Sequence, residues 1–130
     1  MRHELKVRVY YEDTDFSGRV YHASYLRFME RGRTEWLRAN GLENASLAAE
    51  TGLTFAVRSL QIEYLTPAVM DDVVAVMTRV CSLRGAIVEF EQIITRGEAI
   101  LTRSSVQVVT LRGARPVRPP RSLSVRHERA

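Results

Sequence analysis

The stretch Tyr11-Glu12-Asp13-Thr14-Asp15-Phe16-Ser17-Gly18-Arg19-Val20-Tyr21-His22 decides how this chain folds, because it joins a strand pattern to the longest helical pattern in the sequence. It combines acidic side chains, a serine, a glycine, aromatic rings and a histidine. A plain strand-to-helix connection needs none of these groups. We therefore interpret the stretch as an active-site loop aimed at the start of a helix.

Two regular patterns flank this loop. Before it, apolar and polar side chains alternate through residues 3–11, which predicts a half-buried strand. After it, apolar residues recur at helical spacing from about Ala23 to Asn40, and Asn40-Gly41 is a typical helix end. Gly32 lies inside this helix at a cost of about 1 kcal/mol relative to alanine. This glycine indicates close approach of the helix backbone to another element, which we expect to be a sheet.

The rest of the chain is dominated by alternation with a period of two. After a short helix over 46–51, long strands are predicted over 54–65, 72–82, 86–95 and 99–111. Short connections predict hairpins and an antiparallel meander. The fold class is therefore α+β, with one long helix covering a five-stranded antiparallel sheet. Because the sheet edges carry no protective prolines, we expect a second copy to pair with an edge and form a homodimer, and possible pairing of dimers into tetramers is left open.

Length and composition indicate one domain spanning residues 1–130. The single cysteine, Cys81, excludes an intrachain disulfide, and no apolar run reaches the length of a membrane span. We therefore expect a cytoplasmic protein.

The net charge of +4 is unevenly distributed along the chain, because six of the nineteen cations lie after residue 111. This basic tail, from about residue 113, could bind phosphate, an anionic membrane or nucleic acid. We favour a solvated and flexible terminus, and we expect no nucleic-acid partner.

The two aspartates of the loop admit three interpretations. They could bind a metal, but no further ligand lies at a suitable spacing, so no metal is expected. They could cap the helix, but Asp15 lies too far from the helix start, where Ser24 is the ordinary capping candidate. Otherwise one of them is a nucleophile or general base beside the free amides of a helix N-terminus. A carboxylate and amides facing one cleft would favour acyl-transfer chemistry.

Other side chains of the loop are less informative. The ring of His22 could be a general acid, a hydrogen-bond donor to the substrate or a structural partner of a carboxylate. Ser17 has no histidine–acid pair at a suitable spacing and no nucleophile elbow, so a serine hydrolase is disfavoured. The sequence also contains no glycine-rich phosphate loop and no dinucleotide-binding motif.

The loop and the helix that follows it resemble a known family. The segments that carry the resemblance are Tyr10-Tyr11-Glu12-Asp13-Thr14-Asp15, Gly18, Val20-Tyr21-His22-Ala23-Ser24-Tyr25, Glu30-Arg31-Gly32-Arg33-Thr34-Glu35, Ile62-Glu63-Tyr64, Thr66-Pro67-Ala68, Asp72 and Arg84-Gly85. They resemble hotdog-fold acyl-CoA thioesterases of the 4-hydroxybenzoyl-CoA thioesterase family, in the Tol–Pal-associated (YbgC-type) subgroup. The resemblance extends to about Leu123.

The resemblance implies a fold, an activity and roles for particular residues. The fold would be a helix wrapped by an antiparallel sheet that dimerises through its edges, and the activity would be hydrolysis of acyl-CoA without a cofactor. Asp15 would be the nucleophile or general base, the backbone amide of His22 would polarise the thioester carbonyl, and Tyr11 and the His22 side chain would complete the site. Phe16 and Gly32 depart from the family pattern, and Phe16 would reshape the acyl pocket.

Two further readings follow from the same resemblance. A sibling subclass uses a carboxylate on the helix, for which Glu30 and Glu35 are the candidates, although both are more simply surface residues. A hotdog protein could also bind acyl-CoA or acyl carrier protein without catalysis. The presence of both Asp15 and His22 argues against such a binding module, because binding alone needs no carboxylate in the site.

Overall fold

The computed structural model describes residues 2–123. Its elements are β1 (Arg2–Arg8), the short 3-10 helix η1 (Tyr11–Asp13), α1 (His22–Ala39), α2 (Asn44–Thr51), β2 (Leu53–Tyr64), β3 (Val73–Arg84), β4 (Ile87–Arg96), β5 (Ala99–Arg112) and β6 (Arg115–Pro116). The long helix and the five long strands are those predicted, with bounds that differ by a few residues. The first strand ends early, at Arg8, because the Asp13 carboxylate accepts the Tyr10 N–H and turns the chain into η1.

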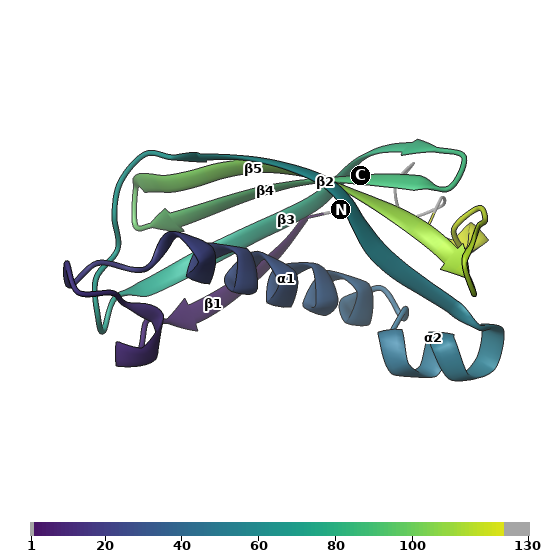
Figure 1. Cartoon of the computed structure of the whole chain (residues 1–130), viewed down its shortest axis with the longest axis horizontal. Coiled ribbons are helices and arrows are strands. Elements are labelled where there is room, and N and C mark those ends of the chain that lie inside the picture. Colours follow the sequence, from purple (N-terminus) through teal and green to yellow (C-terminus); the bar gives the residue numbers. More distant parts are fainter. Residues whose placement is uncertain (1, 124–130) are drawn as a thin grey trace.

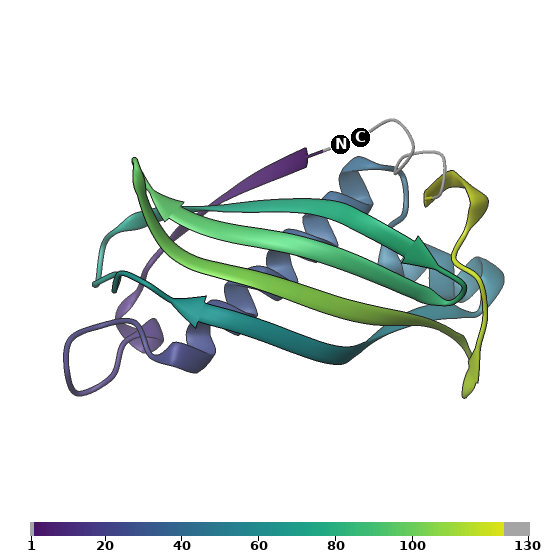
Figure 2. The same cartoon turned by 90° about the horizontal axis from the view of Figure 1, so that it is seen from above.

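The five long strands form one antiparallel sheet in the order β1-β3-β4-β5-β2, and β6 adds two residues beside β5. The helix α1 lies diagonally across one face of this curled sheet (Figures 1 and 2). The predicted α+β architecture, a long helix wrapped by an antiparallel sheet, is therefore confirmed.

The expected meander is wrong at one connection. β2 does not form a hairpin with β3 but pairs with β5 at the far edge of the sheet. The connection of eight residues between Tyr64 and Val73 crosses three strand spacings. Three spacings amount to about 14 Å, and eight extended residues reach on the order of 25 Å. A connection of this length therefore fits a hairpin and a crossing equally well, and the sequence does not distinguish them.

Gly32 allows α1 to lie close against the middle of the sheet, as predicted. A Cβ built on Gly32 would lie 2.7 Å from Val76 Cγ1 and 2.8 Å from Thr78 Oγ1. The fully buried Gln92 fills the space beside it and donates from Nε2 to the Met29 carbonyl and to Thr78 Oγ1. The helix and the sheet are therefore joined by both packing and buried hydrogen bonds at this point.

The two ends of α1 lie at opposite ends of the molecule, with the 10–21 loop at one and α2 at the other (Figure 1). The short helix α2 ends at Gly52, as predicted, in the left-handed conformation. The segment expected to begin a solvated tail lies against the body: β6 pairs with β5, and Leu123 is fully buried. Arg126 and Arg129, part of the predicted basic tail, lie outside the described residues.

Candidate active site

Asp13 closes the base of the loop between β1 and α1. Its side-chain Oδ2 accepts the Tyr10 N–H at 2.9 Å, and its backbone carbonyl accepts the Tyr21 N–H at 2.9 Å. Asp13 is buried, so this pair of contacts holds the two ends of the loop together from inside. Asp13 is thus a structural residue of the loop, and its carboxylate does not face the cavity described below.

Asp15 lies in a tight turn at the tip of the loop and is exposed. Its Oδ1 accepts the Ser17 hydroxyl at 2.5 Å and the Ser17 N–H at 2.9 Å. The chain reverses at Gly18, whose φ of +81° is one that glycine adopts without strain. The hydrogen bonds from Ser17 lower the pKa of the Asp15 carboxyl, so it is ionised at neutral pH. Both donors contact Oδ1, and within residues 2–123 no hydrogen bond is made to Oδ2.

The first turn of α1 presents unpaired backbone amides. Tyr21 is the N-cap residue and makes no side-chain cap hydrogen bond. Across the described part of the chain, the backbone N–H groups of His22 and Ala23 have no backbone acceptor. Ser24, the predicted cap, is instead inside the helix, where its Oγ accepts a hydrogen bond from Arg27. This helix start is therefore open to an anionic or polarised oxygen.

Asp15 and His22 line the same cavity, which has a volume of about 310 Å³. Its walls come from the 10–21 loop, the first turn of α1 and the end of β2 with the residues that follow it: Asp15, Ser17, Arg19, Val20, His22, Tyr25, Tyr64, Leu65, Thr66 and Pro67. His22 is near enough to Asp15 to contribute to lowering its pKa. The structure thus brings together the carboxylate and the helix start that the sequence singled out.

Two tyrosines that the sequence left without a role form one wall of this cavity. Tyr64, on β2, donates its hydroxyl to the His22 carbonyl at 3.0 Å, and its ring meets the Tyr25 ring edge-on at 5.6 Å. Burial raises the pKa of both hydroxyls, so they stay protonated and act as hydrogen-bonding groups. Tyr64 is 42 residues from His22 in the sequence, and no local pattern could have paired them.

Comparison with known proteins places this chain in a family. The model of the family described as the thioesterase superfamily matches residues 17–102, which is more than half of the chain. The chain belongs to the thioesterase superfamily. The match begins two residues after Asp15, so the family assignment itself does not rest on the candidate nucleophile.

Individual relatives are similar in sequence to this thioesterase over most of its length. It is 44% identical over 119 residues to a Haemophilus influenzae protein named acyl-CoA thioesterase YbgC, with 90% of this chain and 88% of the relative covered. It is 46% identical over 104 residues to an Escherichia coli protein named acyl-CoA thioester hydrolase YbgC, with 79% and 77% covered. The crystal structure of a probable thioesterase from Bartonella henselae superposes with a TM-score of 0.89 at 41% identity, covering 92% of this chain and all of that one.

Tyr11, the third predicted site residue, is not brought to the cavity of this thioesterase. It lies in η1 with its ring largely exposed, and its carbonyl accepts the Thr14 N–H. Phe16 also lies outside the cavity and is fully exposed beside Asp15. In a single protomer, neither ring therefore contacts the space between Asp15 and His22.

The alternative helix carboxylates lie elsewhere. Glu30 lines a separate cavity between α1 and the sheet, whereas Glu35 forms an ion pair with Arg38. Within residues 2–123, no cluster of three or more histidine, cysteine, aspartate or glutamate side chains could hold a metal ion. The helices of this same part of the chain are all too short or too polar to cross a membrane.

Proposed function

We propose that this thioesterase hydrolyses acyl-CoA to a free acid and CoA. The observation that carries the proposal is the shared cavity, which is lined by the ionised Asp15 and by His22, whose backbone N–H has no backbone acceptor within residues 2–123. A thioester carbonyl between them would have an attacking group on one side and hydrogen-bond donors on the other. The names of the Haemophilus and Escherichia relatives support acyl-CoA as the substrate class.

Asp15 acts as the nucleophile or general base in this proposal. Its ionised carboxylate can attack the thioester carbon directly or take a proton from an attacking water. In the direct route, Oδ2 bonds to the thioester carbon and the C–S bond breaks, releasing the CoA thiolate, which takes up a proton. Water then hydrolyses the resulting anhydride and restores the Asp15 carboxylate.

His22 contributes chiefly through its backbone N–H, which stabilises the negative charge that develops on the carbonyl oxygen. Its ring lies within the same cavity and can donate a hydrogen bond to the substrate or to the departing thiolate. Tyr11 remains a predicted site residue. Its exposed ring is free to contact a ligand that extends beyond the cavity or a residue of a second copy.

A homodimer is the assembly that best suits this protomer. β2 is an edge strand that pairs with β5 on one side only, and it carries exposed apolar side chains such as Val57 and Tyr64. A second copy pairing along β2 would remove this edge and bring a neighbouring surface toward the open cavity. Sedimentation should therefore give about twice the protomer mass of 14.8 kDa, or four times that mass if dimers pair. A fully active 14.8 kDa species would contradict the dimer.

Turnover of a panel of thioesters distinguishes the proposed hydrolysis from non-catalytic binding of acyl-CoA or acyl carrier protein. Short, long and aromatic acyl-CoAs are offered to the purified protein, and free CoA is detected with a thiol reagent. The proposal expects catalytic CoA release from at least one acyl class. Tight binding of acyl-CoA or acyl carrier protein with no CoA release would instead identify a binding module.

A cytoplasmic location is part of the proposal and is supported by the substrate class and by the free Cys81.

A further inference from the structure

The turn over residues 66–72, between β2 and β3, borders the cavity and receives the 10–21 loop. Thr66 and Pro67 line the cavity directly. The Val20 N–H donates to the Ala68 carbonyl at 2.9 Å, and Arg19 forms a backbone bridge with Val69. The segment that carries Asp15 is therefore docked on this turn and not on the sheet itself.

Ala68 also receives the start of the long helix. Its N–H donates to the Tyr25 hydroxyl at 3.0 Å, and Ala68 is fully buried. Tyr25 lies in the first turn of α1, one residue after Ser24. Ala68 is therefore hydrogen-bonded to both parts of the site. Its carbonyl binds the loop that carries Asp15, and its N–H binds the helix start that carries His22. Any shift of Ala68 changes the position of one relative to the other.

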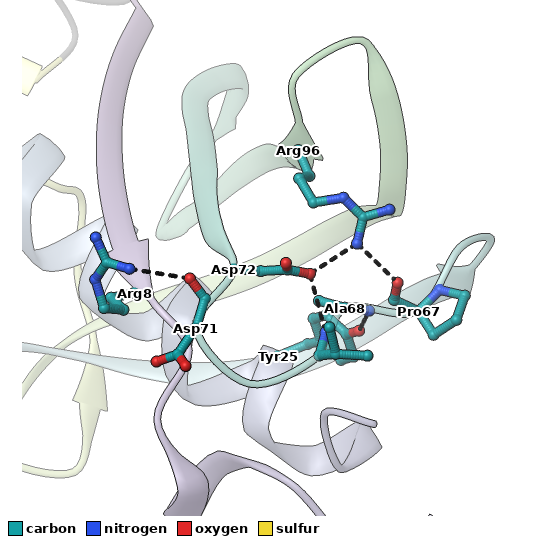
Figure 3. Close-up of polar contacts among 8 residues, drawn as sticks. Arg8, Tyr25, Pro67, Ala68, Asp71, Asp72 and Arg96 are labelled. Carbon is teal, nitrogen blue, oxygen red and sulfur yellow. Dashed lines mark hydrogen bonds and ion pairs between the residues drawn. The ribbon is translucent and has the colours of Figure 1, made fainter. Parts of the chain in front are cut away.

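Asp72 and Arg96 hold the backbone of this turn from the outside. One nitrogen of Arg96, Nη1, donates to Asp72 Oδ2 at 2.8 Å and to the Pro67 carbonyl at 3.2 Å. The same Asp72 oxygen accepts the Val69 N–H at 3.0 Å. Figure 3 shows that Arg96 reaches over from the end of β4 to both groups. The two residues on either side of Ala68, Pro67 and Val69, are thereby tied to one ion pair.

A third set of contacts joins the turn to the end of β1. Asp71 has a φ of +73°, which is unfavourable for a residue other than glycine. It is held there because its N–H donates to the Val9 carbonyl and its own carbonyl accepts a hydrogen bond from Arg8 (Figure 3). The Val9 N–H in turn donates to the Asp72 carbonyl. The end of β1 therefore fixes the turn opposite Arg96.

We propose that Asp72 and Arg96 are positioning residues that set the geometry of the active site through Ala68. Neither lines the cavity, so neither touches the substrate there. Their ion pair fixes Pro67 and Val69, which in turn fixes Ala68, to which Val20 and Tyr25 are hydrogen-bonded. The inference rests on the proposed site at Asp15 and the start of α1. It extends that site to a pair of residues on the far side of the turn.

The test uses Arg96→Met together with Arg79→Met as a matched control. Arg79 forms an ion pair with Glu91 between β3 and β4, away from the cavity, with a 2.9 Å contact like that of Arg96. Misplacing reacting groups by about 1 Å can cost on the order of 100-fold in rate. Arg96→Met should therefore lower kcat by about 10- to 100-fold with little change in KM, while Arg79→Met leaves kcat within about twofold.

Rescue separates positioning from general stability. Arg96→Lys keeps a cationic donor and should recover most of the kcat lost in Arg96→Met at temperatures well below unfolding. Wild-type kcat in a folded Arg96→Met variant would overturn the inference. If Arg96→Met does not fold, Arg96→Gln takes its place, with an expected loss of at least about fivefold and the same overturning result.

Asp15→Asn distinguishes failure of this inference from failure of the site assignment. Loss of turnover in Asp15→Asn with full turnover in the Arg96 variants would overturn the positioning role alone. Full turnover in Asp15→Asn would overturn the site on which that role depends.

Discussion

The middle and the start of α1 differ in how completely they are packed. At the middle, Gly32 lies against β3 with no room for a methyl group, and buried Gln92 has its donors paired with the helix and the sheet. At the start, the amides of His22 and Ala23 have no backbone acceptor within residues 2–123, and Asp15 is exposed. The same helix therefore holds the fold together at one point and leaves polar groups available at another.

This difference implies that stability and chemistry are carried by separate parts of one element. Substitutions at the middle of α1 should change the free energy of unfolding and spare turnover. Substitutions at its start should do the opposite.

Among changes within α1, the largest effect is expected from removing the backbone N–H of His22. His22→Pro deletes that N–H at the first helical position, where proline is tolerated, and Tyr21 already has the extended conformation (φ −62°, ψ 135°) that a following proline requires. His22→Ala is the matched control, because it loses the same ring but keeps the amide. The kcat of His22→Pro should be about 10²–10³ lower than that of His22→Ala. Equal kcat values, with helix content retained by circular dichroism, would show that the amide is not used.

The second effect is on the free energy of unfolding and concerns the middle of α1. Gly32→Ala places a methyl group 2.7–3.0 Å from Val76, Thr78 and Gln92. Overpacking of this kind costs about 1–3 kcal/mol, and the gain in helix propensity of about 1 kcal/mol offsets part of it. Urea unfolding should therefore show a net loss of about 1 kcal/mol with kcat unchanged. A gain of stability would mean that helix propensity alone decides the outcome.

A smaller effect is expected on the pH dependence. The Ser17 hydroxyl and N–H stabilise the charged form of Asp15 and lower its pKa, so activity should persist as the pH falls to the ordinary aspartate value of about 3.9 and below. Ser17→Ala removes the hydroxyl but keeps the N–H. The acidic limb of the kcat/KM profile, measured by brief pH jumps, should shift to higher pH. An unshifted limb would show that the Ser17 hydroxyl does not set the protonation of Asp15.

The smallest effect is expected from Phe16→Ala. This ring is fully exposed in the protomer, so its removal should change the free energy of unfolding by less than about 0.5 kcal/mol. The acyl preference on the thioester panel can still change, because Phe16 adjoins Asp15. Denaturant unfolding of the variant at low protein concentration measures the first quantity. A loss above about 1 kcal/mol would indicate that the ring packs against a surface absent from the single protomer.

The sequence predicted the parts of the molecule that depend on local spacing. The helix, the strands and the approach of Gly32 to the sheet follow from periodicity and from the cost of a helical glycine. Asp15 and His22 are seven residues apart, and a turn at Gly18 suffices to bring them to one cavity. These features need no knowledge of which strands are neighbours.

The sequence could not predict contacts that depend on the order of strands in the sheet. β2 crosses to the far edge, which brings Tyr64 and Pro67 to the cavity and the Pro67 carbonyl within reach of Arg96, while the pairing of β3 with β4 places Arg96 beside Asp72. Each of these residues lies more than forty positions from the loop. A connection length compatible with two topologies carries no information about the position of Pro67, so the link from the Asp72–Arg96 pair to the cavity became visible only in the structure.

Comparing Asp15→Asn with Asp13→Asn tests the central claim, that the Asp15 carboxylate acts on the thioester, most directly. Both variants remove one charge in the same loop, and both amide side chains can still accept the hydrogen bonds made by the native oxygens. Asp15→Asn should lower kcat by about 10²–10⁴, while Asp13→Asn should stay within about tenfold of the wild type. Folded Asp15→Asn protein that releases CoA at the wild-type rate would contradict this role of Asp15.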